Sequence, residues 1–269
     1  IAGVVAAVGP GVTSRTPGQR VTTYLRLDSG PPGTTATILG LTVWGGYAEY
    51  VAVPERVTYL VPDGVEFATA TVVARHAPLA FSMLRDKARV RPGEWVLVMG
   101  AAGGLGSAAV QAAKYLGAKV IAAAGSDARV AAAVELGGDA GINYRSADLT
   151  AEARRITGGA GVDIVLENIG EPQLFAQAFR SLGRNGRLVT AWSHGGGTVP
   201  IDVSHLYFNH ITVMGWTGQS DADVNDSLRA AGEGRFCVLI DRVLPLAEAV
   251  EAHRLVGERK VLGKVVLEP

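Results

Sequence analysis

A glycine-rich turn at residues 100–106 (GAAGGLG) carries the strongest chemical signal in the sequence. Glycine at these positions lets backbone amides approach a pyrophosphate without interference from a β-carbon. The helix expected after the turn adds free N–H donors and a partial positive charge at its N-terminus. The spacing departs from G-x-G-x-x-G, because Ala102 stands where a glycine is expected and the turn has one extra residue. The turn predicts a dinucleotide cofactor, with a purely structural glycine turn as the alternative.

The kind of dinucleotide is indicated about 20 residues further on, where an acidic side chain would hold the ribose hydroxyl of NAD. This sequence has Gly125 and Ser126 at that place. An acid there would repel a 2′-phosphate, whereas Ser126 and Arg129 can donate hydrogen bonds to one. Asp127 is the opposing observation, and it is interpreted as the N-cap of the next helix rather than as a ribose contact. The pattern favours NADPH.

Strands and helices alternate from about residue 77, as in a parallel sheet with crossover helices. Six segments are predicted as strands: residues 94–100, 119–125, 140–144, 162–170, 186–192 and 210–216. Four are predicted as the intervening helices: residues 104–117, 128–138, 150–159 and 173–183. Six such strands make a doubly wound sheet, and the glycine turn follows the first of them.

The flanking segments have a different rhythm. Before about residue 72, short β-rich runs alternate with Gly and Pro turns, which is the spacing of a small all-β unit; the runs are residues 3–9, 17–25, 45–54 and 57–64. After Gly218, a helix, a strand, a helix and a strand are predicted outside the repeating sheet, at residues 221–234, 237–245, 246–260 and 263–269. The predicted class is α/β, with two closely packed domains.

Composition excludes several classes of function. Lys and Arg number 25 against 25 Asp and Glu, so no basic surplus exists to hold a nucleic acid or an anionic membrane. The single cysteine, Cys237, can form no internal disulfide and is interpreted as a buried strand residue in a protein of the reducing cytoplasm. The charge-free run at residues 95–113 is interrupted by four glycines, so it is interpreted as core and not as a membrane span.

The sequence resembles the medium-chain dehydrogenase/reductase superfamily, and more narrowly its zinc-free quinone oxidoreductase-like branch. The matching segments cover essentially the whole chain: AGVVAAVGPGV, PGQRV, GGYAEYVAVP, RVRPGEWVLVMGAAGGLGSAAVQAAKYLGAKVIA, INYR, GGAGVDIVLENIG, GRLV and LGKVVLEP. The resemblance implies a GroES-like catalytic domain at residues 1–76, a Rossmann NADP-binding domain at 77–217 and a return to the catalytic domain at 218–269. It also implies a missing segment before Ile1 that would hold the early active-site positions of the family.

The resemblance assigns cofactor contacts residue by residue. The family more often has an aspartate near Asn168. The expected contacts are Gly103, Gly104, Leu105 and Gly106 for the pyrophosphate, Ser126, Arg129 and Tyr144 for the 2′-phosphate, Asn168 and Gly170 for the nicotinamide ribose, Trp192 and Ser193 for the nicotinamide, and Lys264 for a cofactor phosphate.

Catalytic residues are less well defined, and three candidates are named. His194 follows the expected nicotinamide strand, where it could deliver a proton. His76 aligns near the last catalytic zinc ligand of the family and is interpreted as a metal ligand or, more readily, as an active-site or buried hydrogen-bonding group. Tyr47, with Trp44 and Tyr50, either lines a substrate cleft or belongs to the core of the β-rich domain.

No metal is expected. Zinc members of the family carry four closely spaced cysteines after the PGxRV segment, whereas residues 21–40 contain none. The other histidines, His205, His210 and His253, belong to no motif and are interpreted as surface or packing residues.

The predicted reaction is hydride transfer from NADPH to a small hydrophobic electrophile, either a quinone or an α,β-unsaturated carbonyl compound. Conjugation already polarises such acceptors, so no metal Lewis acid is required. A zinc-type alcohol dehydrogenase is the alternative enzyme. A weakly active nucleotide-binding protein with a structural or sensory role is the third interpretation, because the family usually has a small or hydroxylated residue near Leu79. A homodimer is expected through pairing of the strands at residues 210–216.

Overall fold

The computed structural model describes residues 1–28, 36–258 and 260–269. These residues form two compact units: residues 76–223, here called the sheet unit, and residues 1–75 with 224–269, here called the two-segment unit. The predicted domain ranges stay a prediction. Every helix in the described part of the chain is too short or too polar to cross a membrane.

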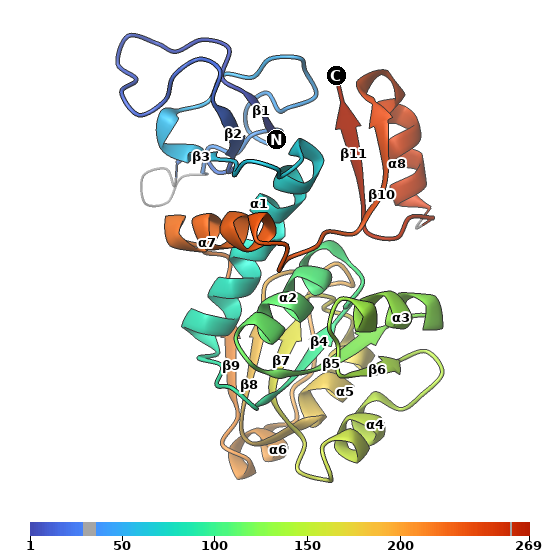
Figure 1. The fold of residues 1–269 in the computed structure, drawn as a ribbon. Helices are drawn as coiled ribbons and strands as arrows, with labels where there is room; N and C mark the ends of the chain where they lie inside the picture. The colour runs from blue at the N-terminus through green and yellow to red at the C-terminus, as the bar shows by residue number, and fades with distance from the viewer. Residues whose placement is uncertain (29–35, 259) are drawn as a thin grey trace. The chain divides into compact units, whose positions relative to one another are not determined.

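A six-stranded parallel sheet forms the centre of the sheet unit (Figure 1). The strands are β4 (Trp95–Met99), β5 (Lys119–Ala124), β6 (Ala140–Asn143), β7 (Val162–Glu167), β8 (Leu182–Thr190) and β9 (Thr212–Gly215). Their order is β6-β5-β4-β7-β8-β9, and all neighbouring pairs are parallel. This order reverses between β4 and β7, as it does in a doubly wound Rossmann sheet. The predicted fold class and its six strands are confirmed.

The helices of the sheet unit begin and end at recognisable signals. They are α2 (Gly104–Tyr115), α3 (Asp127–Glu135), α4 (Leu149–Ile156), α5 (Pro172–Arg180) and α6 (Val203–Phe208). Asp148 caps α4 by accepting a hydrogen bond from the Ala151 amide at 2.9 Å. Gly117 follows α2 with a φ of 82°, which is a conformation that suits glycine and ends the helix. Helix α6 was not predicted from the sequence.

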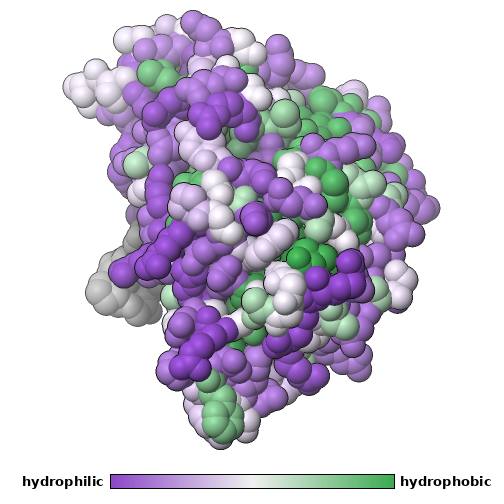
Figure 2. Space-filling view, turned by 60° about the horizontal axis from the view of Figure 1, so that its bottom comes forward, coloured by the Kyte–Doolittle hydropathy of each residue, from purple (hydrophilic) through white to green (hydrophobic). Residues whose placement is uncertain are grey.

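The core of the sheet unit lies on the strands and the helices beside them. Strands buried on both faces are continuously apolar, and Val96 and Leu97 of β4 have no exposed surface. Leu97 packs in one cluster with Ile121 of β5, Leu188 of β8 and Phe179 of α5. On the face drawn in Figure 2, hydrophilic residues cover most of the surface, with hydrophobic patches among them.

Two small sheets organise the two-segment unit. Strands β1 (Ala2–Val4), β2 (Arg20–Thr23) and β3 (Thr58–Leu60) pair antiparallel, while β10 (Ile240–Pro245) and β11 (Lys264–Glu268) pair parallel. The helical elements are η1 (Glu55–Val57), η3 (Leu246–Glu248) and α8 (Ala249–Gly257). Helices α1 (Phe67–Phe81) and α7 (Asp221–Gly232) each cross a boundary between the units, and η2 (Ser82–Lys87) continues α1 as a π-helix.

Two local predictions about this unit are wrong. Residues 45–54 contain no strand, although their residue types favour one. Cys237 is exposed and lies in an irregular segment, not buried in a strand. The prediction that the chain after Gly218 leaves the six-stranded sheet is confirmed, because β10 and β11 form a sheet of their own.

Gly106→Ala should destabilise the sheet unit by about 1–3 kcal/mol, the usual cost of overpacking. A β-carbon at Gly106 would collide with the Gly100 carbonyl oxygen and lie 2.8 Å from the Cα of Ala101, and backbone atoms cannot move aside easily. Chemical denaturation followed by circular dichroism measures the change. Gly257→Ala is the matched control, because nothing lies within 4 Å of its added β-carbon; equal stability of the two variants would contradict the prediction.

Candidate functional site

The glycine turn packs the start of α2 directly against the end of β4. Gly100 adopts a φ of 63°, and the Gly103 amide donates to the Gly100 carbonyl oxygen at 2.8 Å. The first helical hydrogen bond runs from the Ser107 amide to the Gly103 carbonyl oxygen, so the amides of residues 104–106 have no acceptor inside the helix. Free donors at a helix N-terminus fit a diphosphate.

The turn changes the role expected of Gly103. Its amide is engaged inside the turn, so the donors left for a diphosphate are the amides of Gly104, Leu105 and Gly106. Gly103 still matters sterically, because a β-carbon there would lie 3.1 Å from the Gly100 carbonyl oxygen.

The end of β5 brings Gly125, Tyr144 and Arg145 together. A β-carbon built on Gly125 would lie 3.1 Å from the Tyr144 hydroxyl oxygen and 3.3 Å from Arg145 Nε. Tyr144 was predicted for this place from the sequence, whereas Arg145 was not. The signal lay in the strand register: Ala124 pairs with Asn143, so the two residues after β6 come level with Gly125.

The N-terminus of α3 differs from the prediction. Ser126 is the N-cap residue, and its side chain makes no capping hydrogen bond. Asp127 is the first helical residue, and its carboxylate accepts a hydrogen bond from Asn143 Nδ2 at 2.7 Å. The interpretation of Asp127 as the N-cap is therefore wrong. Asn143 also accepts a hydrogen bond from the Arg145 amide at 3.1 Å, so it links the acid to the segment that carries Tyr144 and Arg145.

A pocket of about 480 Å³ opens at the carboxyl ends of β7, β8 and β9. Doubly wound sheets bind ligands at this edge. The lining residues are Glu167, Gly170, Phe175, Thr190, Ala191, Trp192, Ser193, Gly197, Val199, Gly215, Trp216 and Thr217. Three predicted cofactor neighbours, Gly170, Trp192 and Ser193, are among them. The fourth, Asn168, faces the glycine turn, with its Oδ1 3.1 Å from a β-carbon built on Gly100.

Glu167, the last residue of β7, is a site residue that the sequence analysis missed. Its side chain is 1% exposed. One carboxylate oxygen accepts the amides of Ile169 at 2.7 Å and Gly170 at 2.9 Å, and the other accepts the Thr190 hydroxyl at 3.2 Å. Burial raises the pKa of Glu167, while these hydrogen bonds and the charge of His194 act in the opposite direction. The signal in the sequence was an acidic residue directly after the apolar residues 164–166 of this strand.

The loop after β8 lies directly on the turn that Glu167 holds. The Gly195 amide donates to the Ile169 carbonyl oxygen at 2.6 Å, and the Gly197 amide donates to that of Gly170 at 3.4 Å. Gly170 has a φ of 67°, and a β-carbon there would lie 2.9 Å from the Cα of Ser193. The two loops that form the pocket wall are thus coupled through backbone contacts.

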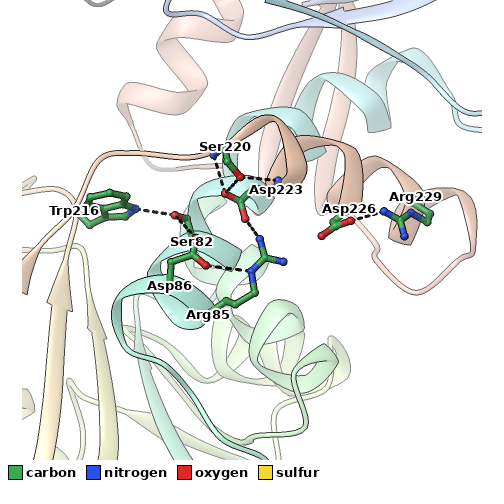
Figure 3. A network of polar contacts seen from close by, with 8 residues as sticks. All are labelled: Ser82, Arg85, Asp86, Trp216, Ser220, Asp223, Asp226 and Arg229. Carbon is green, nitrogen blue, oxygen red and sulfur yellow. Dashed lines mark hydrogen bonds and ion pairs between the residues drawn. The ribbon is translucent and has the colours of Figure 1, made fainter.

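Trp216 forms another wall of the pocket, and a polar network holds it (Figure 3). Its indole Nε1 donates to the Ser82 hydroxyl at 2.9 Å, and that hydroxyl donates to Asp86 at 3.1 Å. Lys87 Nζ lies 3.7 Å from the centre of the indole ring, within the range of a cation–π contact. The π-helix η2 supplies all three partners, and such helices often occur at functional sites.

The same network fixes the segment that leaves the pocket after Trp216 (Figure 3). Asp223 is fully buried and accepts the amide and the hydroxyl of Ser220, each at 2.8 Å. The guanidinium of Arg85 pairs with the other oxygen of Asp223. Removing one of the partners of this buried carboxylate is costly, because the charge would be left without compensation. The segment that carries Trp216 is therefore rigidly placed.

The catalytic candidates lie in different parts of the chain. In the sheet unit, His194 is exposed and stacks on Trp192, with ring centres 5.8 Å apart, while His76 is half-buried in α1. In the two-segment unit, the Tyr47 hydroxyl lies 2.9 Å from Nε2 of His253.

Exposure decides one alternative for the aromatic residues of the β-rich segment. Trp44, Tyr47 and Tyr50 are 95%, 61% and 77% exposed, so the interpretation of these residues as core is wrong. Their place beside a substrate stays a prediction.

Lys264 begins β11 in the two-segment unit. Burial, together with the nearby positive charge of Arg75, lowers the pKa of its ammonium group. Its contact with a cofactor phosphate stays a prediction.

Within the described part of the chain, no three His, Cys, Asp or Glu side chains are grouped to hold a metal ion. The segment compared with the cysteine lobe of zinc members includes residues 29–35, which lie outside the described residues. The expectation of a reaction without zinc stays a prediction.

Comparison with known proteins identifies the family. A model described as "Zinc-binding dehydrogenase" matches residues 104–233, and one described as "Alcohol dehydrogenase GroES-like domain" matches residues 1–63. A 2-haloacrylate reductase of Burkholderia sp is 31% identical over 284 residues, covering 100% of this chain and 79% of that protein. The chain belongs to the medium-chain dehydrogenase/reductase superfamily. The predicted GroES-like domain and the superfamily resemblance are thereby confirmed.

Other members of this superfamily differ in their stated activities. Quinone oxidoreductase-like protein 2 of Bos taurus is 31% identical over 240 residues, covering 86% of this chain and 68% of that protein. A solved structure of an NAD-dependent alcohol dehydrogenase has a TM-score of 0.89 and 36% identity, covering 100% of this chain and 81% of that one. Members of the superfamily are oxidoreductases that bind a nicotinamide cofactor, which the glycine turn and the pocket fit.

Glu167→Gln should gain stability relative to the wild type as the pH rises from about 4 to about 8. The pKa of Glu167 is raised in the folded state. The stability that this side chain contributes to the wild type is therefore present at low pH and is lost as the pH rises through that pKa. Glutamine keeps an oxygen for the two amides and does not titrate. Thermal unfolding across this pH range measures the difference between the two melting temperatures. The exposed Glu135→Gln is the control; a difference independent of pH for both variants would contradict the prediction.

Proposed function

We propose that this protein transfers hydride from NADPH to a small hydrophobic electrophile, either a quinone or an α,β-unsaturated carbonyl compound, without zinc. The observation that carries the proposal is the pocket at the strand ends, whose aromatic walls Phe175, Trp192 and Trp216 suit a flat apolar acceptor beside a nicotinamide ring. Asn168 links this pocket to the glycine turn through its approach to Gly100. NADPH, when bound, supplies the hydride.

The residues of the chain bind and orient the coenzyme. The amides of residues 104–106 hold the diphosphate. Tyr144 and Arg145 hold the 2′-phosphate, together with Ser126 and Arg129. Lys264 holds a phosphate, and the positive charge of Arg75, which acts on Lys264, also favours an anion there.

The acceptor needs a proton donor once the hydride has arrived. A quinone or an enone becomes a hydroquinone anion or an enolate, and a nearby hydroxyl or imidazole stabilises that oxygen. His194 is the candidate in the sheet unit, and Tyr47, hydrogen-bonded to His253, is the candidate in the two-segment unit. His76 is a further candidate in α1.

The names of two relatives support a conjugated acceptor, because one is a quinone oxidoreductase-like protein and the other a 2-haloacrylate reductase. The solved NAD-dependent alcohol dehydrogenase favours the second candidate function, alcohol oxidation of the zinc-dependent type. The third interpretation is a weakly active nucleotide-binding protein. It is supported by Leu79, which is buried in α1 where the family usually has a small or hydroxylated residue.

The proposal extends to assembly and location. Strand β9 is an edge of the sheet, and Val213 on it and Val203, Tyr207 and Phe208 on the neighbouring α6 are exposed. Pairing of two β9 strands would cover this edge and form a homodimer. The partners are a small molecule and a second copy, with neither nucleic acid nor membrane, in the cytoplasm.

Stopped-flow oxidation of NADPH by phenanthrenequinone and by a panel of enones tests the reaction. We expect turnover with conjugated acceptors that survives treatment with a metal chelator. Metal-dependent oxidation of simple alcohols instead would support the alcohol dehydrogenase. Tight NADPH binding with no turnover of any acceptor would support the non-catalytic interpretation.

Arg145→Ala and Arg129→Ala should each weaken NADPH binding by about tenfold or more and leave NADH binding unchanged, because a charge-assisted bond to the 2′-phosphate is lost. Isothermal titration with both coenzymes measures the change, and Arg184→Ala, an exposed arginine of β8, is the matched control. Equal weakening of NADPH and NADH by either variant removes that arginine from the 2′-phosphate site.

A further inference from the structure

The pocket at the ends of β7, β8 and β9 surrounds a carboxyl group with uncharged lining residues. Among its described lining residues, Glu167 is the only one with an ionisable side chain. The remaining lining consists of aromatic and aliphatic side chains, hydroxyl groups and glycine backbone. A ligand in this pocket therefore meets the charge of Glu167 with little competition from other lining side chains.

The carboxylate cannot turn away from a ligand. Its two oxygens are held by the amides of Ile169 and Gly170 and by the hydroxyl of Thr190. Because the side chain is 1% exposed, water screens its charge weakly. A fixed, poorly screened charge acts on its neighbours without any reorganisation.

The two oxidation states of a nicotinamide differ by one positive charge on the ring. The reduced ring is neutral and the oxidised ring is a cation, so a carboxylate favours the oxidised form. The rings of Trp192 and Trp216 also line the pocket, but Trp192 already stacks on His194 and Trp216 already holds the Lys87 ammonium. The preference for the oxidised ring therefore depends on the carboxylate of Glu167.

Hydride donation creates that charge. The C4–H bond of the reduced ring breaks with both of its electrons, and a C–H bond forms at the β-carbon of an enone. The ring becomes a cation and the enone becomes an enolate, which takes a proton from the donor group named under the proposed function. A charge that stabilises the cation lowers the barrier to the step that forms it.

We propose that Glu167 sets the redox preference of the bound coenzyme: its carboxylate stabilises the oxidised nicotinamide relative to the reduced one and so favours hydride donation. This role depends on the proposed function, because it places the nicotinamide in the pocket. His194, on the loop after β8, is the other titratable group that acts on Glu167.

The test compares dissociation constants of NADP⁺ and NADPH for the wild type, Glu167→Gln and Glu167→Asp. Tryptophan fluorescence, to which Trp192 and Trp216 of the pocket contribute, reports binding, and isothermal titration confirms it. Glutamine keeps the shape and removes the charge, so it should weaken NADP⁺ relative to NADPH by about tenfold, as expected for one poorly screened charge. Aspartate keeps the charge and disturbs the geometry, so it should weaken both forms and preserve their ratio.

An unchanged ratio in Glu167→Gln, or an equal shift of the ratio in both variants, overturns the role of Glu167 even where the wild type binds NADPH. A wild type that binds only the NAD⁺/NADH pair overturns the proposed NADPH preference, and the same ratio is then measured with that pair. A wild type that binds neither pair overturns both proposals. If Glu167→Gln does not fold, the wild type is tested alone. Cationic 1-methylnicotinamide should bind more tightly than neutral nicotinamide, as followed by the quenching of tryptophan fluorescence. The reverse order of the two dissociation constants overturns the proposal.

Discussion

Close contact between the backbones of residues 100 and 106 is the constraint on which the coenzyme edge of the sheet depends. The Gly100 carbonyl oxygen occupies the place where any other residue at position 106 would carry a β-carbon. Only this approach lets α2 begin directly at the end of β4, with the amides of residues 104–106 at the sheet edge. The same turn meets Asn168 at the end of β7, so its geometry also sets how β7 enters the site.

The end of β7 repeats this use of bare backbone and adds a charge. Gly170 lies against Ser193, and a β-carbon on Gly195 would lie 2.8 Å from the Cβ of Glu171, so the turn after β7 and the loop after β8 meet at their glycines. Glu167 supplies the acceptor for two amides of the turn. An apolar residue there would leave both amides buried and unpaired, which costs more than a typical hydrogen bond contributes. Local folding therefore explains a polar acceptor at this position, whereas the pocket explains why a full charge is useful.

Much of the sheet unit could be predicted because its signals are local. A parallel strand is buried on both faces and therefore appears as an apolar run, as in EWVLVMG, and a glycine such as Gly117 marks the end of a helix. Residues 45–54 have the same strand-forming composition without a partner strand, and composition does not reveal whether a partner exists. The N-cap of α3 was misplaced by one residue, because Asp127 finds its partner on β6 and not in its own helix.

The site residues that were missed share a non-local cause. Arg145 reaches Gly125 through the pairing of β5 with β6, and Glu167 meets Thr190 through the pairing of β7 with β8. A resemblance transfers positions along the chain, but these contacts depend on which residues stand opposite each other across a sheet. Strand register was the missing quantity in both cases.

The two charged ends of the proposed coenzyme site differ in how strongly solvent acts on them. Arg145 is exposed, so dissolved salt screens its attraction for a 2′-phosphate. The screening length is about 10 Å at ordinary ionic strength. The carboxylate of Asp127 already accepts a hydrogen bond from Asn143 Nδ2, which moderates its repulsion of a phosphate. Glu167 is buried, so its effect on the nicotinamide ring is nearly independent of salt. In the proposed site, selection between coenzymes therefore depends on exposed surface charges, and preference between oxidation states depends on one buried charge that the fold holds in place.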